Sequence, residues 1–122
     1  MEIKTSYAGT NQVAEIISDK VIIQNGDDAL TLISNVHPRF IILHQHNLAE
    51  DVFDLSTRKL GDVLQKLTNY RVHLAVIGDF SKFSSPALKA LIYEMNKQDR
   101  YLFLPTVNEV KNIWARQKDP LI

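Results

Sequence analysis

The chain has 122 residues, 45% of them hydrophobic, and its 14 basic and 14 acidic side chains cancel to a formal net charge of zero. This length fits one domain that buries roughly two thirds of its unfolded surface, and the charge balance argues against nucleic acid as a partner, because a phosphate backbone is bound through a net positive field. The chain has no cysteine, which excludes disulfides and thiolate metal sites, and without a long apolar run we expect no membrane span and a cytoplasmic protein.

The first third of the chain is predicted to form an antiparallel hairpin followed by a helix. Residues typical of strands at Ile3–Ala8 and Gln12–Ser18 flank a turn that contains glycine, and Val21–Ile23 is expected to continue the second strand. Asn25-Gly26 then turns the chain, and acidic residues follow where the amino terminus of a helix favours them. Apolar residues recur at helical spacing until His37-Pro38 ends this helix.

The rest of the chain alternates strands with helices. Short apolar runs predict three further strands, at Phe40–Leu43, Val72–Ile77 and Tyr101–Leu104. Helical spacing predicts one helix from Leu60 to near Asn69, one that begins at Pro86 after a Ser84 or Ser85 cap, and one after a capping box of Thr106 and Glu109. The sequence therefore predicts a single α/β domain over residues 1–122. Its mixed sheet has about five strands, an amino-terminal antiparallel hairpin and then parallel strands, flanked by four helices.

Two imidazoles and two carboxylates form one candidate site. His44 and His46 follow the third predicted strand, Asp51 lies a few residues on, and Asp79 follows the fourth strand. Imidazole and carboxylate together can bind a divalent transition metal, so one hypothesis is a small metal-dependent enzyme. Ordinary loop histidines are the alternative interpretation, because no His-x-x-x-His helix accompanies them. No catalytic residue and no cofactor is predicted from any other motif.

Polar residues beyond the strand ends form a second candidate site. In α/β sheets, ligands bind outside the carboxyl ends of the strands. Asp79, Phe80 and Ser81 occupy that position after the fourth strand. Asp54 and Ser56 precede the helix predicted to begin at Leu60. Capping of a helix explains the Asp54 segment, whereas a phosphate on Ser56 would lie at the positive end of that helix. The spacing of a phosphate-binding glycine loop and of a Gly-x-Ser-x-Gly elbow is absent.

Several blocks of the sequence form a recognisable pattern. They are Phe53-Asp54-Leu55-Ser56-Thr57, Gly61–Lys66, Asn69-Tyr70-Arg71-Val72, Gly78–Lys82 and Ile92–Asn96. The pattern resembles the bacterial family catalogued as domain of unknown function 4180. This resemblance implies a small bacterial cytoplasmic protein, and it implies no activity.

The order of elements is also similar to that of STAS domains, the anti-sigma-factor antagonists that bind partner proteins and are switched by phosphorylation of a serine. An aspartate and a serine between an apolar strand and a helix carry this likeness, which implies that Ser56 matches the phosphorylated position. The chain departs from the STAS pattern Asp-Ser-Ser-Gly-Leu-Gly, because Thr57-Arg58-Lys59 intervene before Leu60-Gly61.

From these patterns we expect a non-enzymatic regulatory or interaction domain with a STAS-like fold. It would bind a protein or a small ligand at the edge formed by Asp54, Ser56, Asp79, Phe80 and Ser81. The alternative is the metal-dependent enzyme. Zero net charge, together with the expected exposure of aromatic residues such as Phe80 and Phe83, is compatible with a homodimer.

Overall fold

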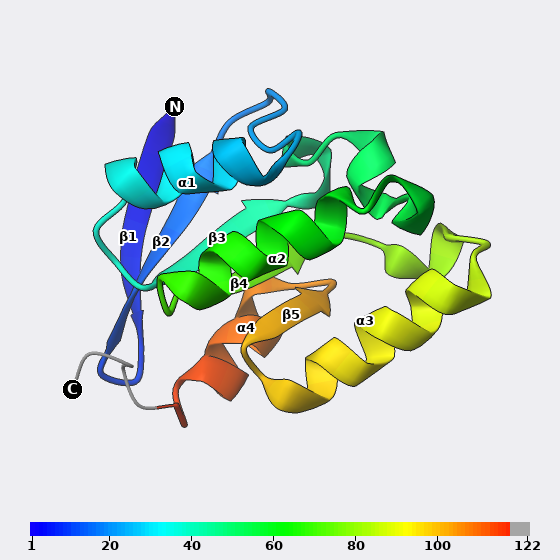
Figure 1. Cartoon of the computed structure of the whole chain (residues 1–122). Coiled ribbons are helices and arrows are strands. Elements are labelled where there is room, and N and C mark those ends of the chain that lie inside the picture. Colours follow the sequence, from blue (N-terminus) through cyan, green and yellow to red (C-terminus); the bar gives the residue numbers. More distant parts are fainter. Residues whose placement is uncertain (118–122) are drawn as a thin grey trace.

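The computed structural model describes residues 1–117 and contains a five-stranded sheet in which the strands follow the order of the sequence, β1-β2-β3-β4-β5. β1 and β2 pair antiparallel, and β3, β4 and β5 each run parallel to the strand before them (Figure 1). The strands are β1 (Glu2–Ala8), β2 (Asn11–Ile17), β3 (Phe40–His44), β4 (His73–Ile77) and β5 (Tyr101–Leu104). The predicted mixed sheet, with its amino-terminal hairpin, is confirmed.

Three helices cover one face of the sheet and one helix covers the other (Figure 1). Each strand–helix–strand connection adds its new strand at the same edge of the growing sheet. Because these connections have the same handedness, their helices lie on one face of the sheet. The helices in the described part of the chain are α1 (Gly26–Asn35), α2 (Lys59–Asn69), α3 (Pro86–Gln98) and α4 (Val107–Trp114). The crossover helices α1, α2 and α3 share a face, and α4 lies alone on the opposite one.

The core consists of two apolar clusters, one on each side of the sheet. Ile41 and Leu43 of β3 belong to the cluster under α1, α2 and α3, whereas Phe40 and Ile42 belong to the cluster under α4. This alternation is what a central strand buried on both faces requires. Trp114 closes the α4 side, where its ring meets that of Phe40 edge-on at a centroid distance of 5.1 Å.

The predicted helix caps are present. Ser85 accepts a hydrogen bond from the Leu88 N–H at 3.2 Å ahead of Pro86, and the Thr106 hydroxyl accepts one from the Glu109 N–H at 3.2 Å. α1 begins at Gly26, one residue after its cap Asn25, so this pair starts the helix as well as turning the chain.

The prediction that Val21–Ile23 continues β2 is wrong. β2 ends at Ile17, and Ile23 makes only an isolated parallel bridge with Leu48. The Asn47 carbonyl accepts hydrogen bonds from the N–H groups of Ile22 at 2.6 Å and Ile23 at 2.9 Å. These bonds draw the segment away from the β1–β2 hairpin and toward the end of β3.

The loops after β3 and β4 are built from short 3-10 turns. Those after β3 are η1 (Gln45–Asn47), η2 (Glu50–Phe53) and η3 (Leu55–Thr57), and η4 (Phe80–Lys82) follows β4. Such turns satisfy backbone groups locally and change the chain direction within a few residues. None of the helices within residues 1–117 has both the length and the apolar character of a bilayer-spanning helix.

Candidate functional site

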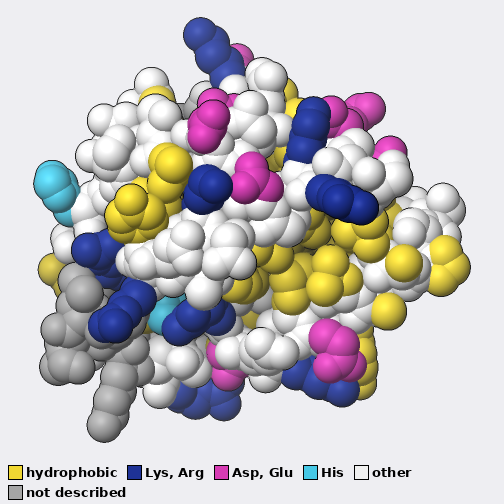
Figure 2. Space-filling model, viewed as in Figure 1, with side chains coloured by type: hydrophobic (Ala, Val, Ile, Leu, Met, Phe, Trp, Pro, Cys, Tyr) yellow, Lys and Arg dark blue, Asp and Glu magenta, His cyan; other side chains and the backbone are white. Residues whose placement is uncertain are grey.

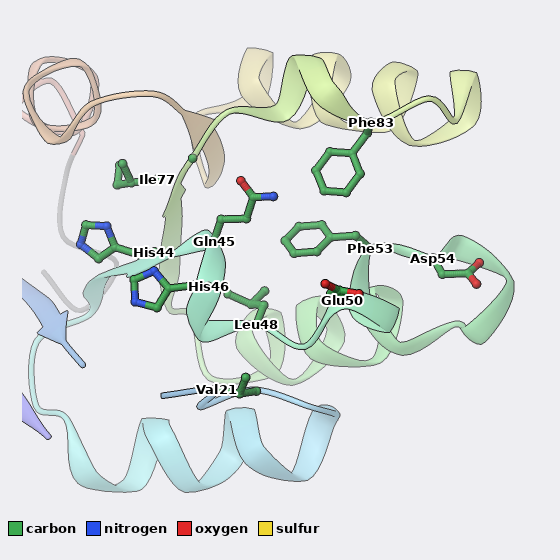
Figure 3. A pocket seen from close by; sticks show the side chains of 11 residues that line it. Val21, His44, Gln45, His46, Leu48, Glu50, Phe53, Asp54, Ile77 and Phe83 are labelled. Atoms are coloured by element: carbon green, nitrogen blue, oxygen red, sulfur yellow. The ribbon is translucent and has the colours of Figure 1, made fainter. Parts of the chain in front are cut away.

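An open pocket of about 890 Å³ lies at the carboxyl ends of β3 and β4. The strand ends and η1 form one wall, while η2 and the loops that follow β2 and η4 form the others (Figure 3). The lining residues are Val21, His44, Gln45, His46, Leu48, Glu50, Phe53, Asp54, Ile77, Gly78 and Phe83. The pocket therefore lies at the edge of the sheet where the sequence predicted a binding site.

Gln45 is the central polar side chain of this pocket. Figure 3 shows its amide between the imidazoles and the phenylalanine rings. A Cβ atom on Gly78 would lie only 2.4 Å from the Gln45 Oε1 atom. The missing side chain at the end of β4 thus makes room for the amide.

The two imidazoles are held by hydrogen bonds outside the pocket. The His44 ring meets a Glu15 carboxylate oxygen of β2 through Nε2 at 2.9 Å, and the His46 Nε2 atom meets the Ser18 carbonyl oxygen at 2.7 Å. In both cases Nε2 must carry the proton, because a carbonyl or carboxylate oxygen can only accept. The two rings also stack, with centroids 5.9 Å apart.

The four residues of the metal hypothesis do not form a metal-binding group. Across residues 1–117, no three histidine or acidic side chains come together as a set of ligands. His44 and His46 each direct Nε2 to an oxygen. Asp51 pairs with the Lys59 ammonium, and Asp79 caps the turn that follows it. Each side chain therefore has a local contact of another kind.

Two Asp-x-Ser segments form the same local structure. The Asp54 Oδ1 atom accepts hydrogen bonds from the Ser56 N–H at 3.0 Å and the Ser56 hydroxyl at 2.7 Å. Asp79 accepts the same two bonds from Ser81, with an N···O distance of 3.1 Å for the N–H. The serine hydroxyl, followed by the backbone N–H, lowers the pKa of each aspartate below its usual 3.8, because both bonds favour the charged carboxylate.

The predicted binding edge coincides only in part with the lining of this pocket. Asp54 lines the pocket, whereas Ser56, Asp79, Phe80 and Ser81 do not belong to its lining. The Asp54 segment meets the start of α2 through Thr57, whose hydroxyl accepts a hydrogen bond from the Lys59 N–H at 3.3 Å, and not through Asp54. Asp54 caps η3, and the residue that precedes α2 is Arg58, whose left-handed backbone (φ 62°) separates the two elements.

Phenylalanine rings form the apolar wall of the pocket. The Phe53 and Phe83 centroids lie 5.1 Å apart, and Phe80 packs against Phe53 at 6.1 Å and against Phe103 at 5.4 Å. The predicted exposure of Phe80 and Phe83 is wrong, since both are half-buried against the core. Figure 2 shows apolar side chains reaching the surface on the α2 and α3 side of the molecule.

Asn47 holds the pocket wall together, and it was not among the residues predicted from the sequence. It is fully buried, its Oδ1 atom accepts the His44 N–H at 2.9 Å, and its Nδ2 group donates to the carbonyls of Ser18 at 3.0 Å and Lys20 at 2.9 Å. Gln45 and Glu15 were missed as well. A polar residue directly after an apolar strand is a weak signal for Gln45, Asn47 lies only three residues beyond β3, and no sequence signal marks Glu15 within β2.

Comparisons with known proteins identify a family and nothing closer. The model of the family described as "Domain of unknown function (DUF4180)" matches residues 8–113, a span that includes every residue lining the pocket. No curated protein and no solved structure matches the chain. On this match the chain belongs to the DUF4180 family.

Proposed function

We propose that the protein is a non-enzymatic binding module whose ligand is a small organic molecule with an apolar ring and a positively charged or hydrogen-bond-donating group. The observation that carries the proposal is the lining of the pocket. It combines phenylalanine and aliphatic side chains with a few polar and charged groups, as small-molecule sites do.

The charges of the lining favour a cationic ligand over an anionic one. Glu50 and Asp54 supply carboxylates, and no lysine or arginine is among the residues that line this pocket. The faces of Phe53 and Phe83 also attract a cation through their negative quadrupoles. The Gln45 carbonyl oxygen, which lies over Gly78, supplies a neutral acceptor in the same space.

The hydrogen bonds of the two histidines orient their rings at the pocket wall. The proton lies on Nε2 of each ring, so Nδ1 is the nitrogen that can accept a hydrogen bond from a ligand. In this structure Nε2 of His44 faces Glu15 and Nε2 of His46 faces the Ser18 carbonyl. Both bonds hold the rings in place as walls of the pocket.

Two matched probes test the proposal. 2-Phenylethylamine and phenylacetate carry the same ring and opposite charges, so they separate apolar binding from charge preference. We expect the amine to shift the amide resonances of Gln45, Gly78 and Phe83 in a two-dimensional NMR titration, and phenylacetate to shift them at least about fivefold less at equal concentration. The proposal is wrong if neither probe shifts these resonances, or if the acid binds as well as the amine.

A pair of variants locates the binding. Gln45→Leu removes the central amide from the pocket with little change of volume, whereas Gln65→Leu makes the same exchange on the exposed surface of α2. We expect Gln45→Leu to weaken amine binding about tenfold, the effect of one lost hydrogen bond to a charged group, and Gln65→Leu to leave it unchanged. Equal affinities for the two variants would place the amine elsewhere.

We further propose that Ser56 regulates this pocket. Its exposed hydroxyl donates to Asp54, and Asp54 is part of the lining. A phosphate on Ser56 would bring about two negative charges next to that carboxylate and disrupt η3 by repulsion. We expect Ser56→Asp to change amine binding and Ser56→Ala to leave it within about twofold of the wild type. Equal affinities for Ser56→Asp, Ser56→Ala and the wild type would remove the switch and leave the binding module.

A STAS-like, partner-regulated role in the bacterial cytoplasm belongs to the same proposal. Its support is the alternation of parallel strands and helices and the position of the Asp-x-Ser segment between β3 and α2. Fractionation of the source cells tests the location, and recovery with the membrane or outside the cell would contradict it.

A further inference from the structure

β1 is an edge strand with apolar side chains in solvent. It is the first strand in the order of the sheet, most of its residues are exposed, and Figure 1 shows it at the outer edge, coloured blue. Ile3 is 39% exposed and Tyr7 is 63% exposed, and both lie on the face of the sheet that carries α1. An exposed strand of this kind is a template for pairing with another strand.

The opposite edge of the sheet is protected. The Phe103 N–H of β5 donates to the Asn96 Oδ1 atom at 2.7 Å, and the Asn96 Nδ2 group donates to the Phe103 carbonyl at 3.2 Å. The Asn96 side chain therefore satisfies both outward backbone groups of Phe103, at the middle of this edge. β1 contains no proline, and its register with β2 is continuous over seven residue pairs without a bulge.

The hairpin determines which groups of β1 point outward. Only Gly9 and Thr10 separate the paired residues Ala8 and Asn11, and the residues that flank a two-residue turn exchange backbone hydrogen bonds. Alternate residues along β1 then face β2 in the same way. The N–H and C=O groups of Ile3, Thr5 and Tyr7 consequently point away from β2.

We propose that β1 pairs antiparallel with β1 of a second copy of this chain, with the two-fold axis at Thr5, so that one sheet runs through both copies. In this register Thr5 lies opposite Thr5, and Ile3 lies opposite Tyr7 of the other copy. All outward backbone groups of these three residues are then paired. This surface is separate from the pocket and does not rest on the proposed function.

Charge and side-chain pairing favour this register over its neighbours. Lys4 faces Ser6 and Glu2 faces Ala8 of the other copy, so no like charges meet. A shift of two residues one way would place Lys4 opposite Lys4, which destabilises a strand pair, and the opposite shift would leave Ile3 outside the paired strands. The net charge of zero adds no long-range repulsion between two copies.

A single cysteine tests the register. The chain has no cysteine of its own, so Thr5→Cys introduces one thiol per copy. Two residues that exchange hydrogen bonds across antiparallel strands have Cα atoms about 5.5 Å apart, within the range of a disulfide. We expect Thr5→Cys to form a covalent dimer under mild oxidation. The matched variant Lys4→Cys, whose thiols lie opposite Ser6, is expected to remain uncrosslinked.

Sedimentation equilibrium tests the dimer without any crosslink. Thr5→Pro removes an outward N–H that β2 does not use, so the hairpin keeps its ladder while the centre of the interface loses its hydrogen bonds. We expect this variant to raise the dimer dissociation constant at least about tenfold and Thr5→Val, which keeps the N–H, to leave it unchanged. Circular dichroism checks that both variants fold.

Three results would overturn the proposal. The first is a wild type that stays monomeric up to millimolar concentration. The second is equal crosslinking of Thr5→Cys and Lys4→Cys. The third is the same dimer dissociation constant for folded Thr5→Pro and folded Thr5→Val.

Discussion

At the scale of single residues, Asn47 determines how the chain surrounds the pocket. Its side chain joins the end of β3 to the carbonyls of Ser18 and Lys20, and its own carbonyl accepts from Ile22 and Ile23. One buried amide thus fixes both the turn after β3 and the loop after β2.

Asn47→Ala is expected to lower the free energy of unfolding by about 3 kcal/mol, because it removes a fully buried side chain together with its hydrogen bonds to the His44 N–H and to the carbonyls of Ser18 and Lys20. Asn69→Ala, at the exposed end of α2, is the control and should cost no more than about 0.5 kcal/mol. Urea unfolding followed by circular dichroism measures both. Similar values for the two variants would mean that the loops around the pocket do not depend on Asn47.

The two Asp-x-Ser turns give the stability a pH dependence of known sign. The pKa of Asp54 and that of Asp79 are both lowered in the folded protein from the usual 3.8. A lowered folded-state pKa contributes stability at pH values above the unfolded pKa, and this contribution is lost as pH falls through the folded pKa.

We therefore expect Asp54→Asn and Asp79→Asn to be less stable than the wild type at about pH 7 and closer to it at about pH 2, because the wild-type carboxyls gain protons as pH falls through their lowered pKa. Asp19→Asn removes another exposed carboxyl and is the control. Urea midpoints at both pH values provide the measurement, and a difference from the wild type that is independent of pH would contradict the assignment.

At the scale of elements, a carboxylate of α2 binds a backbone N–H at the start of α1. The Gly26 N–H at the start of α1 donates to the Asp62 Oδ2 atom of α2 at 3.0 Å. A Cβ atom on Gly26 would lie 2.2 Å from that same oxygen, so the absent side chain permits the contact. The start of one helix therefore depends on a residue 36 positions away in the sequence.

A double-mutant cycle measures this contact. Asp62→Ala should cost about 1 kcal/mol for the lost cap, and Gly26→Ala should cost a similar amount because it displaces the carboxylate. Together they should cost clearly less than the sum, since the clash disappears with Asp62. Gly61→Ala, where a Cβ meets nothing within 4 Å in α2, should instead stabilise by up to about 1 kcal/mol. Additive effects at Gly26 and Asp62 would argue against a direct contact.

Elements were predictable where their signals are local, whereas for the pocket only its position beyond the strand ends and part of its lining were. The parallel strands and the caps at Ser85 and Thr106 follow from periodicity and from residues next to the helix starts. Val21–Ile23 has the composition of a strand, yet hydrogen bonds to Asn47 override that preference. The pocket brings together residues from β3, β4 and the loop after β2. No local pattern in a single sequence shows that the loop after β2 reaches the ends of β3 and β4.

At the scale of the whole molecule, α4 is the one helix within residues 1–117 that covers its face of the sheet. Trp114 is fully buried there, and its indole N–H donates to the Asp99 carbonyl at 2.9 Å. The amide of Asn11, beside the first hairpin turn, donates to the Trp114 carbonyl at 2.9 Å. The last helix is thus bonded to the first turn of the sheet.

Trp114→Ala is expected to lower the free energy of unfolding by about 4 kcal/mol, the usual cost of deleting a large buried ring. Tyr93→Ala removes an exposed ring from α3, 63% of whose surface is in solvent, and should change it by less than about 0.5 kcal/mol. Thermal unfolding followed by circular dichroism compares them. A small effect of Trp114→Ala would mean that α4 contributes little to the fold.

The order of the strands has a consequence for synthesis on the ribosome. Since each strand pairs with the one made just before it, the sheet can grow from its amino-terminal hairpin as the chain emerges, without waiting for a distant partner. The α4 face is the exception. Phe40, Ile42 and Ala75 stay uncovered until Trp114 has been made, so the nascent chain exposes an apolar surface to chaperones until the residues of α4 have left the tunnel.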